Sequence, residues 1–259
     1  MRGLLSCLRV GALAAGVLAA WAPAHAQSNT CADCHLSRPD LAGTRHVADW
    51  ENGPHGRNGV GCESCHGGNP KSFEPFLAHR GMLHRSHPAS PVGRIALPVT
   101  CGRCHAGPFT AFQKSRHYEL VRSGDRDAPT CATCHGETAA VLLSPRQLEA
   151  RCASCHGAGR VAPNVDFPAE GRLMLEGIRA ARAELKEAEA VIRRINDAPR
   201  RTALEAEAAR AGVPLAEATS AGHAFVFERL QERLALARER IAALYERLAN
   251  PGEAKAVPR

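Results

Sequence analysis

One short motif, Cys-x-x-Cys-His, dominates this sequence and occurs five times. Its copies are Cys31, Cys34 and His35; Cys62, Cys65 and His66; Cys101, Cys104 and His105; Cys131, Cys134 and His135; and Cys152, Cys155 and His156. This spacing is typical of c-type haem attachment, because cysteines one helical turn apart reach the two vinyl groups of a porphyrin. The adjoining histidine then presents its imidazole to the iron. The motif therefore predicts five covalently attached haems c.

Paired cysteines also occur in disulfide frameworks and in zinc knuckles, so both are alternatives. A zinc knuckle, however, has no need for a histidine directly after every second cysteine. With 13 histidines among 259 residues, the chance of five such coincidences is about 3 in 10 million. The histidines therefore favour haem over zinc.

The N-terminus predicts an exported protein. Basic residues Arg2 and Arg9 precede an apolar run from Val10 to Trp21, and Ala24-His25-Ala26 is a small-x-small cleavage site. Residues 1–26 are therefore interpreted as a signal peptide that is cleaved before Gln27, which predicts a periplasmic location. The alternative is an uncleaved anchor, for which the apolar run is short of the roughly 20 residues that span a bilayer. Cys7 leaves with the leader.

The remaining chain divides into two regions of different composition. Residues 27–160 hold all five motifs, are rich in Gly and Pro, and predict a loop-rich cytochrome c domain with short helices. Residues 161–259 lack cysteine, and apolar residues recur there at steps of three and four from Met174 to Ile195 and from His223 to Leu248. This predicts a mainly α fold in which a long antiparallel helical hairpin follows the haem domain. We expect a short helix in the connection of the hairpin and Pro214 in the first turn of its second helix.

Aromatic residues make up only 4% of the chain, too few for an ordinary aromatic core. Apolar porphyrins take over that role, so the haem-bearing region is expected not to fold without them. Successive motifs begin 31, 39, 30 and 21 residues apart, which is too close for separate domains. The haems should therefore lie near one another.

The sixth ligand of each iron decides between electron transfer and catalysis, because a bis-His iron has no open position for a substrate. Apart from His25 and the motif histidines, the candidates are His46, His55, His79, His84, His87, His117 and His223. We nominate His223 because it opens the second long helix on the same stripe as Phe227 and Leu230. His46, His84 and His87 compete for the last place, and we take His46 as the candidate.

Four stretches between residues 31 and 156 resemble multihaem c-type cytochromes related to hydroxylamine oxidoreductase and to its tetrahaem cytochrome electron acceptor. They are residues 50–68 (WENGPHGRNGVGCESCHGG), 78–81 (AHRG), 101–117 with FQKSRH at its end, and 129–136 (PTCATCHG). The resemblance implies that His55 and His117 are distal ligands and that His79 is another. The catalytic Cys-x-x-Cys-Lys motif of related nitrite reductases is absent from the sequence. Tyr118 and Tyr245 are its only tyrosines, and we interpret Tyr118 as a packing residue.

The formal charge of +7 falls to +5 when Arg2 and Arg9 leave with the leader. Each ferric bis-His haem adds about −1 through its propionates, which brings the whole to about zero and argues against nucleic-acid binding. We expect a periplasmic carrier that passes electrons between redox partner proteins in the periplasm or at the membrane surface. The alternatives are an oxidoreductase that acts on a small nitrogen or sulfur oxyanion at one five-coordinate haem, and a subunit of a membrane complex. The apolar stripe of the C-terminal helices could also mediate a homodimer or a complex.

Overall fold

The computed structural model describes residues 29–38, 40–41, 44–138 and 142–250. The predicted leader, with Cys7 and the expected cleavage site, lies outside the described residues. The described part is helical and contains no strand, which confirms the mainly α class. Short helices come first: α1 (Thr30–Ser37), α2 (Thr44–Glu51), α3 (Pro54–Arg57), α4 (Glu63–His66), α5 (Pro75–Ala78), α6 (Leu97–Gly102), α7 (Ala106–Phe112), α8 (Arg116–Arg122), α9 (Cys131–His135) and α10 (Pro145–His156).

Three long helices follow: α11 (Phe167–Ile192), α12 (Ala198–Ala224) and α13 (Phe227–Ala249). The sequence led us to expect two long helices and a short helix in their connection, but that connection forms the 27-residue helix α12. Pro199 lies in the first turn of α12, and Asp197 caps it by accepting a hydrogen bond from the Arg200 amide at 3.1 Å. Pro214 lies inside α12 and not at the start of a helix, which corrects the prediction.

The main apolar core lies among the three long helices. Many of its buried side chains are alanine, and Ala181, Ala188, Ala218 and Ala237 are fully buried. Small side chains at these points let neighbouring helices approach closely. Larger residues such as Ile192, Leu204 and Ile241 fill the remaining space. The expected 3–4 periodicity thus forms a conventional helical core.

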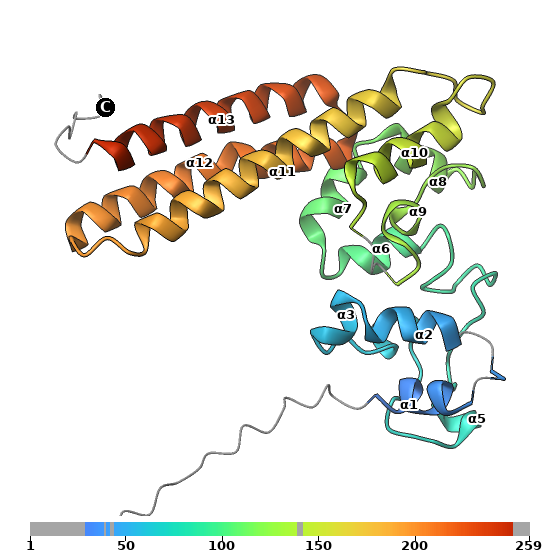
Figure 1. The fold of residues 1–259 in the computed structure, drawn as a ribbon. Coiled ribbons are helices and arrows are strands. Elements are labelled where there is room, and N and C mark those ends of the chain that lie inside the picture. Colours follow the sequence, from blue (N-terminus) through green and yellow to red (C-terminus); the bar gives the residue numbers. More distant parts are fainter. Residues whose placement is uncertain (1–28, 39, 42–43, 139–141, 251–259) are drawn as a thin grey trace, which may run out of the picture.

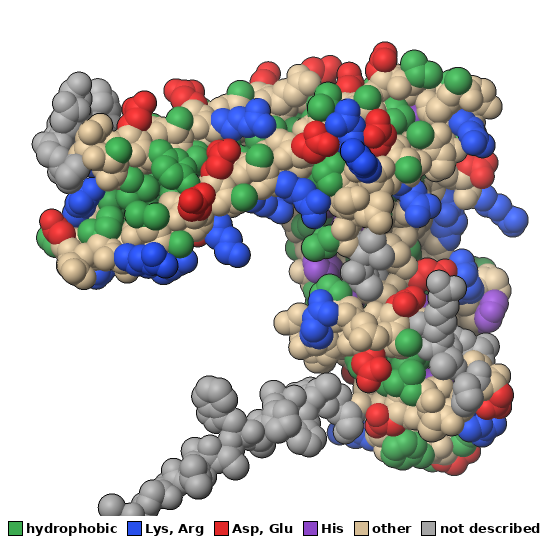
Figure 2. All heavy atoms as spheres, viewed as in Figure 1, with side chains coloured by type: hydrophobic (Ala, Val, Ile, Leu, Met, Phe, Trp, Pro, Cys, Tyr) green, Lys and Arg blue, Asp and Glu red, His purple; other side chains and the backbone are tan. Residues whose placement is uncertain are grey.

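The motif-bearing region stands at one end of the three helices, with α6 to α10 next to them and α1, α2, α3 and α5 farther away (Figure 1). Helix α10 packs against α11 and α7 packs against α12, whereas α1 and α5 lie at the far end. The outer faces of the long helices carry acidic and basic side chains interspersed with one another (Figure 2). In the described part of the chain, no helix is long and apolar enough to cross a membrane.

Candidate haem sites

Each motif places its two cysteines about one turn apart because it lies on or beside a short helix. Asn29 starts α1 by accepting hydrogen bonds from the amides of Cys31 and Ala32 at 3.1 and 3.4 Å. The second and fourth motifs lie at α4 and α9, and both helices end at the motif histidine. The next residues, Gly67 and Gly136, have φ angles of 75° and 80°, which glycine adopts without strain and which turn the chain away.

The other two motifs are placed differently. Cys101 lies in α6, Cys104 lies in the turn that follows α6, and His105 is the N-cap residue of α7. The fifth motif forms the last turn of α10, a 12-residue helix that begins with a reciprocal capping box between Ser144 and Gln147. All five motifs therefore present their cysteines and histidine from a helix or from a turn next to a helix.

None of the ten described cysteines forms a disulfide bond. Burial is the main cause that raises the pKa of several of these thiols, and it raises the pKa of Cys62 to about 11. Burial raises the pKa of Cys134 and Cys152 as well. Thiols in such surroundings are neutral at pH 7. The described residues also contain no group of three or more His, Cys, Asp or Glu side chains arranged around a single metal ion, as a zinc knuckle requires.

The structure brings every motif histidine beside one histidine from outside the motifs. The distances between ring centres fall in a narrow range, from 5.9 to 6.4 Å. The pairs are His35 with His79 (6.2 Å), His66 with His46 (5.9 Å), His105 with His55 (6.0 Å), His135 with His223 (6.4 Å) and His156 with His117 (6.0 Å). No ring belongs to two of these pairs.

The spacing of the paired rings fits an iron held between them. Two metal–imidazole bonds of about 2 Å in line, together with the half-widths of the two rings, come to about 6 Å. Aromatic rings in simple contact also lie at roughly 4.5–7 Å, so the distance alone does not distinguish a metal site from ring packing. The composition of the pairs favours a metal site, because each pair joins one motif histidine to one other histidine. The donor set therefore fits five haem irons with an imidazole on each face.

Hydrogen bonds at Nδ1 orient most of the non-motif rings. Each such bond to a backbone carbonyl fixes the proton on Nδ1 and leaves Nε2 as the nitrogen for a metal. The carbonyls are Thr138 O for His55 (2.9 Å), Pro75 O for His79 (2.8 Å) and Thr219 O for His223 (2.9 Å). The Nδ1 of His46 faces the Glu137 carboxylate at 3.6 Å.

His117 is different, because its Nδ1 is buried and has no hydrogen-bond partner among the described residues. Burial lowers its pKa, and the neighbouring His156 adds to that effect. Burial likewise lowers the pKa of His66, with a smaller effect from His46. Both rings are therefore kept neutral, as a metal-binding imidazole must be.

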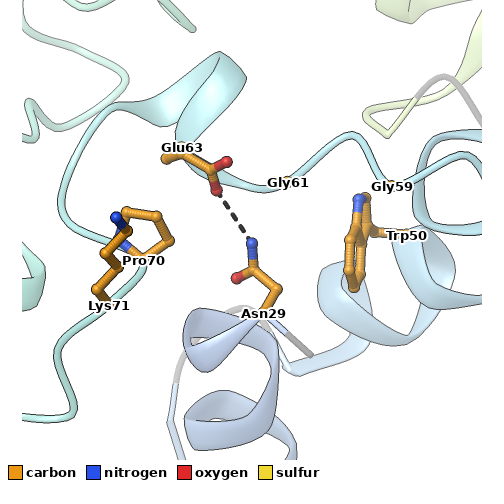
Figure 3. A pocket seen from close by; sticks show the side chains of 7 residues that line it. All are labelled: Asn29, Trp50, Gly59, Gly61, Glu63, Pro70 and Lys71. Carbon is orange, nitrogen blue, oxygen red and sulfur yellow. Dashed lines mark hydrogen bonds between the residues drawn. The ribbon is translucent and has the colours of Figure 1, made fainter. Parts of the chain in front are cut away.

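Contacts join the motifs in sequence order. The Asn29 amide, beside the first motif, donates a hydrogen bond to Glu63 in the second at 3.0 Å, next to a cavity of about 210 Å³ (Figure 3). Gly61 makes room for this contact, since a Cβ there would lie 2.6 Å from the Asn29 amide nitrogen. His55, which shortly precedes the second motif, pairs with His105 of the third.

The later motifs are joined in the same way. The thiol of Cys101 in the third motif lies close enough to that of Cys131 in the fourth to lower the pKa of Cys131. Cys152 and Cys155 of the fifth motif lie close enough to raise the pKa of Cys134, although burial is the larger cause. The contacts thus connect first to second, second to third, third to fourth and fourth to fifth.

The remaining competitors for a ligand position lie elsewhere. His84 and His87 are exposed and bond within their own turn, His84 to the Ser86 hydroxyl at 2.8 Å and His87 to the Ala89 amide at 3.1 Å. Tyr118 is buried between Phe109 and Phe112.

His223 lies in the last turn of α12, although the sequence led us to expect it at the opening of the second long helix. The apolar stripe indicated His223, but the stripe could not show that α12 ends at Ala224, three residues before the next stripe residue, Phe227. The sequence analysis also missed Phe167 and Phe225, whose rings pack against His156 and His117. The closeness of Phe225 to His223 in the chain was the available signal.

Two protein families match parts of this chain. Residues 82–157 match the family described as "Cytochrome c7 and related cytochrome c", and residues 15–67 match "Cytochrome c554 and c-prime". The first match covers three of the motifs and the second covers the other two.

Curated relatives come from Geobacter sulfurreducens. "C-type polyheme cytochrome OmcB" of strain ATCC 51573 / DSM 12127 / PCA is 32% identical over 124 residues, which is 44% of this chain and 14% of the relative. OmcB of strain DL-1 / KN400 gives the same values. "C-type polyheme cytochrome OmcC" is 25% identical over 119 residues, or 43% of this chain and 15% of the relative.

The chain thus spans only 14 to 15% of the length of these curated relatives. No solved structure matches it. The matches agree with the cysteine and histidine pattern, because both family descriptions and all three relatives are cytochromes of the c type. In residues 15–67 and 82–157 this chain is thus similar to multihaem c-type cytochromes.

Proposed function

We propose that this chain is a pentahaem c-type cytochrome that passes electrons between redox partner proteins in the periplasm. The observation that carries the proposal is the pairing of every motif histidine with one further histidine at 5.9–6.4 Å. When bound, c-type haem supplies an iron that takes up and releases one electron. The polyhaem relatives OmcB and OmcC support the same class of function.

The residues have distinct roles in this proposal. The ten motif cysteines would tether the porphyrins, and each motif histidine would supply one imidazole to an iron. His46, His55, His79, His117 and His223 would supply the second imidazoles, with Nδ1 hydrogen bonds that keep most of these rings in the metal-binding tautomer. Two imidazoles on each iron leave no position for a substrate, which favours electron transfer over catalysis.

We further propose that the five sites form a single file in sequence order. The support is the series of contacts from Asn29–Glu63 to Cys134 and the fifth motif. One end of the file is the His35–His79 pair, near α5 and far from the long helices (Figure 1). The other end is the His117–His156 pair, beside α11 and α12. Electrons would enter at one end and leave at the other.

Electron paramagnetic resonance of the oxidised holoprotein tests the ligand proposal. Five bis-His irons give five low-spin ferric signals and no high-spin signal. A high-spin signal from one of the five would contradict the proposal and support an oxidoreductase that acts on a nitrogen or sulfur oxyanion. The relation to hydroxylamine oxidoreductase remains a prediction, since none of the matches reported above names that enzyme.

The periplasmic location and the partners are proposals as well. The location rests on the leader pattern from Arg2 to Ala26. Fractionation with and without detergent tests it: a periplasmic carrier is released without detergent. Release only after detergent is added would favour a subunit of a membrane complex, which could bind through the long C-terminal helices.

A further inference from the structure

The pair formed by His117 and His156, here called the fifth site, differs from the others because the long helices pack against both of its rings. Phe225, just after α12, lies 4.3 Å from the His117 ring, with the two planes at 87°. Phe167, the first residue of α11, lies 5.5 Å from the His156 ring at 66°. The three-helix region thus holds the fifth site from two sides.

The backbone of Phe225 is unusual. It has φ 57° and ψ 36°, and it is the only residue other than glycine with a positive φ in the described part of the chain. A bulky side chain in this left-handed region costs conformational energy and persists where the surroundings compensate for it. Phe225 ends α12, and its amide donates to the carbonyls of Ala221 and Gly222. Such a helix end normally favours glycine, so a phenylalanine here calls for a role for its ring.

The surroundings of His117 indicate that role. Three of the other non-motif rings donate Nδ1–H to a backbone carbonyl, and His46 faces a carboxylate. These contacts fix the plane of each ring. The Nδ1 of His117 is buried without such a partner among the described residues. Packing alone must therefore orient His117, and the closest aromatic ring recorded beside it is Phe225.

We propose that Phe225 is a positioning residue that fixes the plane of the His117 imidazole and thereby the relative orientation of the two axial rings at the fifth site. The planes of His117 and His156 lie at 52°. His156 has a second restraint, because its Nδ1 donates to Ala162 O at 2.8 Å. The inference rests on the proposed function, since it concerns the haem that these two histidines would hold.

The signals of a low-spin ferric haem depend on the angle between its two imidazole planes, so electron paramagnetic resonance of the holoprotein reports on this role. The variants are F225L and F225G, and the matched control is F167L, which removes the ring beside the doubly restrained His156. F225G also relieves the left-handed backbone, so a change seen in it does not come from added backbone strain. His117→Ala identifies the signal of the fifth site by removing it from the low-spin set.

We expect F225L and F225G to shift or broaden the signal of the fifth site alone, and F225Y, which keeps an aromatic ring, to retain the wild-type signal. F167L should leave all the signals in place. The inference is overturned if both F225L and F225G retain the wild-type spectrum, or if F167L shifts the fifth signal as much as they do. Wild-type protein without a low-spin signal from the fifth site would overturn the proposed function instead, so the two failures are distinguishable.

Discussion

A hydrogen bond at Nδ1 orients a histidine ring and leaves Nε2 free for a metal, and the acceptor of this bond differs from residue to residue. For His55, His79 and His223 the acceptor is a carbonyl one turn away or in a distant loop. For His79 and His223 the acceptor is the carbonyl four residues earlier, so a helical turn is enough to supply the restraint. His55 depends on Thr138, which is 83 residues away.

The role of His223 can be tested by His223→Ala. Alanine favours helix, so α12 should persist, while the iron beside His135 loses its second imidazole. We expect one of the five low-spin ferric signals to be replaced by a high-spin signal in electron paramagnetic resonance. His84→Ala, at an exposed turn, is the control and should leave the spectrum unchanged. If the two variants gave the same spectrum, His223 would not be a ligand.

The sequence predicted the individual ligand candidates better than their pairing. The motif histidines follow from local spacing, and His223 follows from the 3–4 stripe. Which ring faces which depends on contacts between distant segments, as with His35 and His79 or His135 and His223. No local pattern encodes such contacts, so the pairing became visible only in the fold.

At the scale of the elements, a contact between α12 and α13 explains why Pro214 does not end α12. Proline has no N–H, so it leaves the carbonyl of Arg210, four residues earlier, without its helical donor. The guanidinium of Arg240 on α13 donates to this carbonyl at 2.8 Å. The sequence analysis expected Pro214 at a helix start because proline is favoured there. The compensating donor lies on another helix, 30 residues away.

A double-mutant cycle tests this compensation. In the wild-type background, Arg240→Ala should lower the free energy of unfolding by about 0.5–1 kcal/mol, because the Arg210 carbonyl loses its hydrogen-bond donor. In the Pro214→Ala background, residue 214 itself supplies an N–H to the Arg210 carbonyl. Arg240→Ala should therefore lower the free energy of unfolding clearly less in that background. Urea unfolding of the full chain, followed by circular dichroism, measures both. Arg229→Ala, at an exposed site on α13, is the control. If Arg240→Ala lowered the free energy of unfolding equally in both backgrounds, the compensation would be contradicted.

Asn29 offers a second test at this scale, because its side chain both caps α1 and donates to Glu63. Asn29→Ala loses both contacts and should lower the free energy of unfolding by about 1–2 kcal/mol. Asn29→Asp keeps the cap but sets one carboxylate against another, and adding Glu63→Gln should restore stability. Thermal unfolding of the holoprotein measures the series. No recovery in the double variant would show that the Asn29–Glu63 contact does not join the two motifs.

At the scale of the whole molecule, the two regions are stabilised differently. The core cluster extends from Met174 to Leu244 and lies entirely in the three long helices. The motif-bearing region has few buried apolar side chains of its own, and Phe73, Phe76 and Leu77 are exposed there. That porphyrins complete its core stays a prediction. The sequence predicted the contrast between the regions because the two regions differ in composition. It did not predict that α12 is a third long helix, because the residues of α12 form a helix that is stabilised by packing against α11 and α13.

Limited proteolysis tests this difference. When the chain is produced without haem ligation, trypsin should cut rapidly between residues 29 and 156, and a fragment that contains α11 to α13 should survive. The reason is that buried apolar surface stabilises the long helices without a cofactor. The holoprotein, digested in parallel, should resist cleavage in both regions. Equal resistance of the first region with and without haem would contradict this account.

The most direct test of the account is the mass of the intact mature protein, purified after expression with the haem-ligation machinery and measured under denaturing conditions that retain only covalent attachments. The account predicts a mass equal to that of the processed chain plus five haem groups, one for each Cys-x-x-Cys-His motif. A mass with fewer than five haem groups, or that of the bare chain, would contradict it.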